Sequence, residues 1–273
     1  MVLTMTATTE SRPGVGGLLR NWRQRRRLSQ LDLANEAAVS ARHLSFVENG
    51  RSRPSRELVL HLAEHLDVPL RDRNALLLAA GYAPSYRETP LDSEAMTPVR
   101  DAVALLLAGH EPFPAIVIDR LWNLVSANGP AVAIMSESVD PALLAPPANA
   151  MRVTLHPDGL APRIANFTQY SGNLIDRLRR EAGAYADGRL GELIEELCGY
   201  PGVAGSPSPG ATAAELFVPL VLRTGEGELT FFSTLTTFGT ARDITVEELA
   251  IESFFPADAA TAAVLRDRWQ AAG

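Results

Sequence analysis

The chain has 273 residues, of which 46% are hydrophobic and 21% charged, which excludes a globally disordered protein and leaves room for two domains. Its longest apolar run, residues 102–108, falls far short of the ~18 residues that cross a membrane, and the first 17 residues lack the pattern of a signal peptide. A single cysteine, Cys198, excludes an intrachain disulfide and a cysteine-based zinc site. These features predict a cytoplasmic protein that does not enter a membrane.

The charge is unevenly distributed along the chain. Residues 1–90 hold 13 Arg against 9 acidic residues, a net charge of +4, whereas residues 91–273 hold 12 Arg against 23 acidic residues, a net charge of −11. The chain contains no lysine, and arginine is the better bidentate partner for phosphate and guanine. A basic head on an acidic body predicts a nucleic-acid-binding module joined to a second domain.

Composition divides the chain into four segments. Residues 1–17 are rich in Thr, Ser and Gly and are expected to form a flexible arm. Residues 18–83 show a succession of short helical patterns, which predicts an all-α bundle. Residues 84–98 contain three prolines and no sustained periodicity, and are interpreted as a linker. Residues 99–273 are expected to form a mixed α/β domain.

Two capped helices stand out in the all-α segment. Ser29 is a favourable N-cap for a helix over residues 30–37, and Ser40 is one for a helix over residues 41–48. Asn49 and Gly50 then tolerate the positive φ that ends a helix. Two short helices joined by a tight connection predict a helix-turn-helix.

The outward face of the second helix is expected to enter a major groove. Leu44 and Val47 lie three residues apart and can pack inward, which turns the other side of the helix toward DNA. His43 either assists a phosphate contact or is a surface histidine without a ligand. Phe46 either contacts a thymine methyl group or packs partly buried. The basic run over residues 23–27 either approaches phosphates in part or forms a solvated helix face.

The strings over residues 28–34, 39–40, 46–51 and 54–55 resemble the Cro/C1-type (XRE) helix-turn-helix. The resemblance implies that Gln30 holds a phosphate at the head of the first helix of the motif, and that Arg42 lies at the base-reading head of the second. It also implies a partly buried ion pair between Arg23 and Glu48. The candidate DNA-binding residues are Gln30, Ser40, Ala41, Arg42, His43, Ser45, Phe46, Arg51 and Arg53.

Catalytic motifs are weak or missing. Residues 61–65, His-Leu-Ala-Glu-His, match the pattern of inverted zinc peptidases, but they fall in the fourth helix of a small bundle where no cleft is expected. The sequence lacks a G-x-S-x-G elbow and a Walker A motif, and Cys198 has no histidine near it in sequence. We therefore expect no metal, no cofactor and no enzymatic activity.

The C-terminal segment alternates between helical and strand patterns. Helices are expected over residues 99–108, 164–186, 189–198 and 257–269, and strands over residues 115–119, 121–126, 216–222 and 228–237. A stretch containing Pro141, Pro146 and Pro147 has the composition of a disordered segment, and residues 205–210 are expected to form a loop.

A second resemblance extends over nearly the whole chain. The strings over residues 73–83, 110–114, 119–123, 127–128, 151–152, 156–159, 164–166, 177–181 and 200–202 resemble the MmyB-type regulators. The resemblance implies a PAS-like second domain that binds fatty-acid-like molecules, although Phe167 stands where the family usually has Trp. The candidate ligand-binding residues are Trp122, Asn128, Arg152, His156, Asn166 and Phe167. Arg152, His156 and Asn128 are the candidates for the polar head of the ligand, and each has a structural role as its alternative.

These observations predict a transcriptional regulator that binds a palindromic operator as a homodimer and is gated by a small amphiphilic ligand. The alternative is a DNA-binding regulator whose C-terminal domain is a ligand-free dimerisation or protein-interaction module. A DNA-bound enzyme is disfavoured by the missing motifs.

Overall fold

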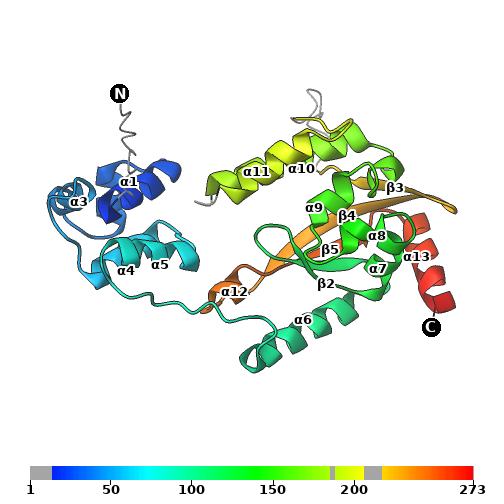
Figure 1. The fold of residues 1–273 in the computed structure, drawn as a ribbon, viewed down its shortest axis with the longest axis horizontal. Helices are drawn as coiled ribbons and strands as arrows, with labels where there is room; N and C mark the ends of the chain where they lie inside the picture. Colours follow the sequence, from blue (N-terminus) through cyan, green and yellow to red (C-terminus); the bar gives the residue numbers. More distant parts are fainter. Residues whose placement is uncertain (1–13, 185–187, 206–216, 273) are drawn as a thin grey trace, which may run out of the picture. The chain divides into compact units, whose positions relative to one another are not determined.

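The computed structural model describes residues 14–184, 188–205 and 217–272. The chain splits into two compact units, Met1–Arg87 and Glu88–Gly273, and each is described here by itself (Figure 1). The first unit contains only helices among its described residues: α1 (Val15–Arg25), α2 (Gln30–Glu36), α3 (Ala41–Glu48), α4 (Arg56–His65) and α5 (Leu70–Ala79).

Local capping sets the helix boundaries of the first unit. The hydroxyl of Ser29 accepts a hydrogen bond from the amide of Asp32, whose carboxylate accepts one from the amide of Ser29, and this capping box starts α2. The Ser40 hydroxyl accepts from the amide of His43 and starts α3. Gly50 follows α3 with a φ of +69°, in the left-handed region that glycine tolerates. Both helices of the predicted motif therefore begin where the sequence places them.

The core of the first unit brings α1 directly against α3. Leu19, Trp22, Leu33 and Leu44 are buried together with the apolar side of α4. A Cβ atom on Gly16 would lie 2.2 Å from the carbonyl oxygen of Val47, so only glycine permits this approach. The close contact aligns α1 with α3.

The second unit is an antiparallel sheet with helices on both faces. Its strands are β1 (Ala115–Ile118), β2 (Leu124–Ala127), β3 (Leu220–Thr224), β4 (Gly227–Thr237) and β5 (Ala250–Pro256), in the order β2-β1-β5-β4-β3. Its helices are η1 (Glu94–Met96), α6 (Thr97–His110), α7 (Gly129–Ser136), α8 (Pro141–Leu144), α9 (Ala150–Leu155), η2 (Ala161–Arg163), α10 (Phe167–Ala184), α11 (Arg189–Cys198), α12 (Ile244–Glu247) and α13 (Ala259–Ala272).

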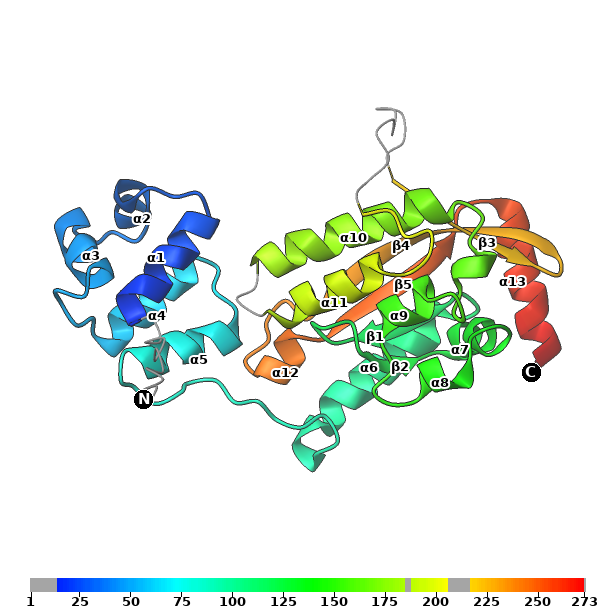
Figure 2. The same ribbon diagram turned by 45° about the horizontal axis from the view of Figure 1, so that its top comes forward.

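Alternating residues of the strands face two separate cores. Ile116 and Ile118 of β1 pack with α7, α9, α10 and α11, whereas Ala115 and Val117 pack with Val103 and Leu107 of α6. Figures 1 and 2 show α10 and α11 side by side over one face of the sheet and α6 along the other. The predicted fold class is confirmed: an all-α helix-turn-helix bundle and a mixed α/β, PAS-like domain.

Several predicted elements differ from the structure. The proline-containing stretch is wrong as a disordered segment, because Pro141 occupies the first turn of α8, where its missing N–H costs nothing. The predicted strand over residues 121–126 begins only at Leu124, since Trp122 has a φ of +65° and turns the chain. Strand β5, in the middle of the sheet, was not predicted.

Other boundaries differ by a few residues or fall outside the described part of the chain. Helix α1 begins at Val15, within the predicted arm, and residues 1–13 lie outside the described residues. The predicted loop over residues 205–210, the start of the predicted strand over residues 216–222 and the end of the predicted helix over residues 164–186 also reach into residues that are not described. Among the described residues no helix is both long and apolar enough to cross a membrane.

The segment that joins α5 to α6 forms side-chain hydrogen bonds within each unit. Asn74 Oδ1 accepts hydrogen bonds from the amides of Ser85 and Tyr86 in the first unit. Thr89 donates its hydroxyl hydrogen to Asp243 Oδ2 over 2.6 Å in the second. The predicted linker, residues 84–98, also contains η1, and its role as a linker stays a prediction.

Candidate functional site

Helix α3 presents one polar face to solvent. Leu44 and Val47 are buried, whereas Arg42 and His43 are exposed and Ser45 is half-buried. The guanidinium of Arg42 lies 5.4 Å from the ring centre of the half-buried Phe46, one helical turn away, and this cation–π contact restricts the arginine. The exposed face thus carries a positive group held against an aromatic ring at the start of a capped helix.

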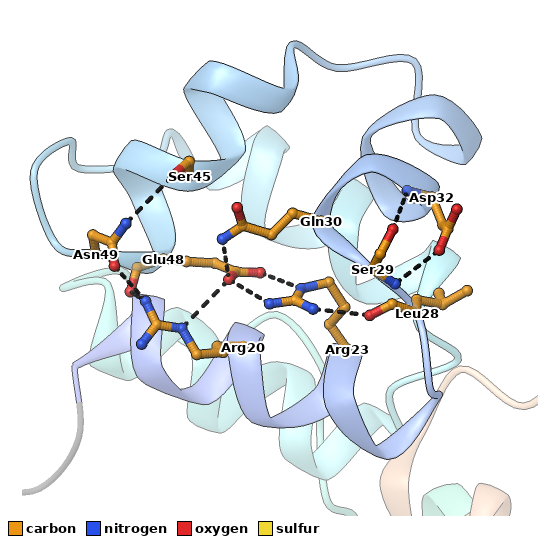
Figure 3. A network of polar contacts seen from close by, with 9 residues as sticks. All are labelled: Arg20, Arg23, Leu28, Ser29, Gln30, Asp32, Ser45, Glu48 and Asn49. Atoms are coloured by element: carbon orange, nitrogen blue, oxygen red, sulfur yellow. Dashed lines mark hydrogen bonds and ion pairs between the residues drawn. The ribbon is translucent and has the colours of Figure 1, made fainter.

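The Glu48 carboxylate joins the first three helices (Figure 3). Arg23 Nε donates to Glu48 Oε1 over 2.7 Å and Arg23 Nη2 donates to Oε2 over 2.8 Å, forming the bidentate ion pair that the sequence resemblance implies. Gln30 Nε2 of α2 donates to Glu48 Oε2 over 2.8 Å. The ion pair is well shielded, because Arg23 is 8% exposed and Glu48 is 3% exposed.

Two opposing effects act on the pKa of Glu48. Burial disfavours the charged carboxylate, but hydrogen bonds from Arg23 and Gln30 and the positive charge of Arg23 outweigh burial. The pKa of Glu48 therefore lies below its ordinary value. The carboxylate stays ionised at neutral pH and keeps α1, α2 and α3 in one arrangement.

Arg20 extends this network to the end of α3. Its Nη2 donates to the backbone carbonyl of Glu48 over 3.1 Å and to Asn49 Oδ1 over 2.5 Å (Figure 3). Asn49 Nδ2 donates in turn to the hydroxyl of Ser45 over 3.3 Å. A predicted DNA-facing residue, Ser45, is thereby linked to α1, a connection that sequence reasoning did not find.

The remaining candidate DNA-binding residues have different environments. Ser40 caps α3, half-buried Ala41 begins it, and Arg51 is exposed just beyond its end. Arg53 instead donates from Nε and Nη2 to the carbonyl oxygen of Ala80, over 3.1 and 2.9 Å, and lies over the ring of Tyr82. In this arrangement the guanidinium of Arg53 ties the loop after α3 to the end of α5.

The two histidines of the zinc-like pattern interact within the helical bundle. His61 Nε2 lies 2.7 Å from the carbonyl oxygen of Ala37, and His65 Nδ1 lies 2.9 Å from the carbonyl oxygen of His61. Over the part of the chain that the structure describes, no three His, Cys, Asp or Glu residues are grouped as a metal site would require.

An apolar cavity of about 80 Å³ lies in the second unit between the sheet and its larger helical layer. All five strands contribute to its wall, through Ile116, Leu124, Leu222, Phe231 and Phe254, together with Leu220. Helices α7, α9 and α10 close the other side with residues that include Ile134, Val153 and Tyr170. A concave apolar site with few polar groups is typical of a small-molecule site.

The six predicted ligand-binding residues lie elsewhere. Asn128 caps α7: its Oδ1 accepts from the amides of Ala115 and Ala131, and its Nδ2 donates to the carbonyl of Phe113 over 2.8 Å. Asn166 forms hydrogen bonds with the backbone at the start of β3: it donates to the carbonyl of Pro219 and accepts from the amide of Val221. Both amides connect backbone segments.

The charged and aromatic candidates also have structural partners. Arg152 forms a bidentate ion pair with Glu196, at 2.7 and 2.6 Å, and His156 stacks edge-on against Tyr200 with ring centres 4.9 Å apart. Phe167 packs at the margin of the main core. Their contribution to ligand binding stays a prediction.

Trp122 is buried in the main core of the second unit and takes part in a polar cluster. Its Nε1 donates to Glu181 Oε2 over 2.8 Å, and the guanidinium of Arg177 lies 4.4 Å from its ring centre. Arg177 also forms ion pairs with Glu181 and Glu252, each at a distance of 3.1 Å. These contacts hold Trp122 at its positive φ, which is unfavourable for a bulky residue.

Sequence reasoning missed the two hydroxyl-bearing residues of the cavity wall, Thr154 and Tyr170. Thr154 donates its hydroxyl hydrogen to the carbonyl of Ala150 within its own helix. Tyr170 lies in the first turn of α10, whose inward face could be predicted from its periodicity, but its position at a cavity depends on distant strands.

This combination of a capped, exposed helix-turn-helix and a second domain with an apolar cavity defines a DNA-binding transcriptional regulator with a ligand-binding domain. Comparison with family models agrees: residues 15–76 match a helix-turn-helix domain, and residues 99–267 match the MmyB-like transcription regulator ligand binding domain. The second match covers more than half of the chain, so the protein belongs to the MmyB-like transcription regulator family.

The other comparisons give no match or a distant one. No curated protein matches the chain significantly. Among solved structures, the chain is similar to a chain described as the structure of an RNA-binding Light-Oxygen-Voltage receptor, with 14% identity and a TM-score of 0.26. The match covers 93% of this chain and 60% of that one, so the chain spans less than two thirds of that relative.

Proposed function

We propose that the protein binds a palindromic operator as a homodimer and that a small amphiphilic, fatty-acid-like ligand in the second unit changes its affinity for DNA. The observation that carries the proposal is the presence, in one chain, of a capped helix with an exposed polar face and an apolar cavity lined by sheet and helices. A regulator of this kind acts on chromosomal DNA in the cytoplasm, in association with the nucleoid.

The exposed face of α3 supplies the contacts to DNA in this proposal. Arg42 is aimed outward from the first turn and is steadied by Phe46, which suits it for a bidentate contact with guanine or phosphate. Ser45 and His43 lie on the same exposed side, and Arg51 follows where the backbone of DNA would pass. Gln30 keeps one N–H free of Glu48 for a phosphate, since an amide nitrogen carries two.

In this proposal the protein acts as a dimer. Helix-turn-helix dimers contact half-sites one helical turn, ~34 Å, apart, so the spacing between two recognition helices controls affinity. A ligand that changes this spacing would switch the protein between binding states, provided that it binds the two states with different affinity.

The cavity favours a ligand over the alternative of a ligand-free interaction module. Burying an acyl tail against its apolar wall stabilises the complex by ~0.8 kcal/mol per methylene. Ile134 lines this cavity and also a second hollow of about 220 Å³ between α7 and α13, so movement of one side chain would lengthen the space for a tail. A ligand-free module is expected to have a filled core at this position.

The DNA-binding part is tested by Arg42→Ala. A preferred operator is first selected from random duplexes with the wild-type protein, and Kd is then measured by fluorescence anisotropy. Loss of a bidentate base contact weakens specific binding by ~1–3 kcal/mol, about five- to 150-fold. Arg180→Ala, which removes an exposed arginine of α10 in the other unit, is the matched control and should leave Kd unchanged. An Arg42→Ala variant with wild-type affinity would refute the proposed recognition surface.

The ligand-binding part is tested by mass spectrometry of small molecules released on denaturing the purified full-length protein. One amphiphile present near one copy per chain, which changes Kd for the operator when it is added back, supports the gated regulator. Protein that carries no small molecule, and whose DNA affinity does not respond to a series of fatty acids and their esters, supports the interaction module instead.

A further inference from the structure

The apolar wall of the cavity includes Tyr170, whose hydroxyl has no hydrogen-bond partner within the described part of the chain. Tyr170 is 9% exposed and lines the cavity, yet none of the hydrogen bonds found among the described residues involves its hydroxyl. The hydroxyl oxygen is not among the fully buried side-chain atoms that lack a partner, so it keeps some accessible surface at which an acceptor could reach it. The second hydroxyl of the wall, on Thr154, already donates to the carbonyl of Ala150.

The Tyr170 hydroxyl is a donor throughout the physiological pH range. Burial raises the pKa of Tyr170 well above its ordinary value, the negative charge of Glu252 raises it further, and Arg177 partly opposes this. A group with this environment remains protonated and can donate to an acceptor inside the cavity.

The charges near Tyr170 disfavour an anionic partner. Arg177 is shared between the carboxylates of Glu181 and Glu252, which leaves the three groups with one excess negative charge. Glu252 is 5% exposed and accepts further from the hydroxyl of Ser233 over 2.9 Å, so this charge is fixed close to the cavity. Among the described residues that line the cavity, none is a charged side chain that could neutralise a carboxylate.

We propose that the Tyr170 hydroxyl donates a hydrogen bond to an uncharged acceptor of the ligand, such as the carbonyl of an ester, a lactone or a ketone that carries an alkyl chain. The inference rests on the proposed function, because it narrows the class of amphiphile that the same cavity takes. The cavity of about 80 Å³ accommodates the acceptor and a short alkyl segment, roughly the space of five to eight water molecules. The excess negative charge of Arg177, Glu181 and Glu252 disfavours a free carboxylate in the interior, and the described lining residues offer no cation to offset it.

The proposal is tested with two probes of equal chain length, methyl octanoate and octanoate, titrated into the full-length protein by calorimetry at neutral pH. We expect the ester to bind more tightly than the carboxylate. In Tyr170→Phe, the affinity for the ester should fall by roughly three- to tenfold, the effect of one neutral hydrogen bond, and the affinity for octanoate should not change. Thr154→Val, in the same wall, is the matched control and should keep the ester affinity within about twofold, since its hydroxyl is already donated.

Infrared spectroscopy gives a second measurement that reports on the bond directly. The carbonyl stretch of carbonyl-labelled methyl octanoate should move to lower frequency on binding to the wild type, and this shift should be missing in Tyr170→Phe. Circular dichroism would detect a Tyr170→Phe variant that fails to fold. In that case two measurements on the wild type still test the proposal: the affinity for the ester compared with that for octanoate, and the shift of the carbonyl stretch.

The outcomes separate this inference from the proposed function. Octanoate that binds as tightly as the ester, or ester binding that is equal in wild type and Tyr170→Phe, overturns the role of Tyr170 and leaves ligand gating standing. Binding of neither probe shows that the cavity takes no such amphiphile and overturns both proposals.

Discussion

The Arg23–Glu48 ion pair allows a quantitative test of what holds the DNA-binding unit together. Replacing Glu48 by Leu leaves Arg23, which is 8% exposed, with the carbonyl of Leu28, at 2.8 Å, as the one remaining hydrogen-bond partner of its guanidinium among the described residues. We expect the unit to lose ~3–5 kcal/mol, because the surviving charge remains buried. Arg23→Met should cost less, ~1–3 kcal/mol, since Glu48 keeps its hydrogen bond from Gln30.

The double variant Arg23→Met/Glu48→Leu distinguishes a buried charge from lost packing. Replacing both partners by apolar side chains of similar volume removes the uncompensated charge, so the double variant should be more stable than Glu48→Leu alone. If packing were the main contribution, the two losses would instead add.

The loss of stability can be measured in the full-length protein, without separating the two units. The assay is hydrogen exchange, followed by mass spectrometry on peptides from residues 15–50. At ~1.4 kcal/mol per factor of ten, the expected loss lowers protection about 150-fold to a few thousandfold in Glu48→Leu. Glu36→Gln, at an exposed position of α2, serves as the control and should shift stability by no more than ~0.5 kcal/mol. Two results would refute the reasoning. One is amide protection in Glu48→Leu that stays within tenfold of the wild type. The other is a double variant that is no more stable than Glu48→Leu.

Two further predictions concern pH and the second unit. Because the pKa of Glu48 is lowered in the folded state, its contribution is complete above its ordinary value of 4.5 and is lost as pH falls through the lower folded pKa. The urea midpoints of wild type and Glu48→Gln should therefore converge in acid, and a constant difference would contradict this. Asn128→Ala should destabilise the second unit by ~2–4 kcal/mol in thermal unfolding, since it removes a helix cap and leaves the buried amide of Ala115 unpaired. Gln270→Ala, at an exposed position of α13, is its control; equal unfolding temperatures for the two variants would show that Asn128 has no structural role.

Sequence patterns were most informative where structure depends on neighbours in the chain. Ser29 and Ser40 mark the starts of α2 and α3, and Gly50 marks the turn after α3, because capping and backbone conformation are decided within a few residues. The Arg23–Glu48 pair was implied only by family resemblance, since two oppositely charged residues 25 positions apart give no periodic signal.

Patterns failed where long-range contacts outweigh local preference. Strand β5 contains Glu252 and ends at Pro256, which is an unfavourable composition for a central strand, but Arg177 and Ser233 satisfy the buried carboxylate from elsewhere in the chain. The prolines around α8 were misleading for a related reason, because a proline in the first turn of a helix is compatible with it.

The sequence by itself determined the helix-turn-helix, the mixed α/β class of the second unit and the uneven charge that separates the two. Only the tertiary structure decided which side chains line the cavity. The predicted polar residues Asn128, Arg152 and Asn166 connect backbone segments and helices, whereas the hydroxyl of Tyr170 has no partner among the described residues. Capping and periodicity are short-range effects that a sequence shows directly. A cavity forms where segments distant in the chain pack without filling the space between them, and no local pattern records this.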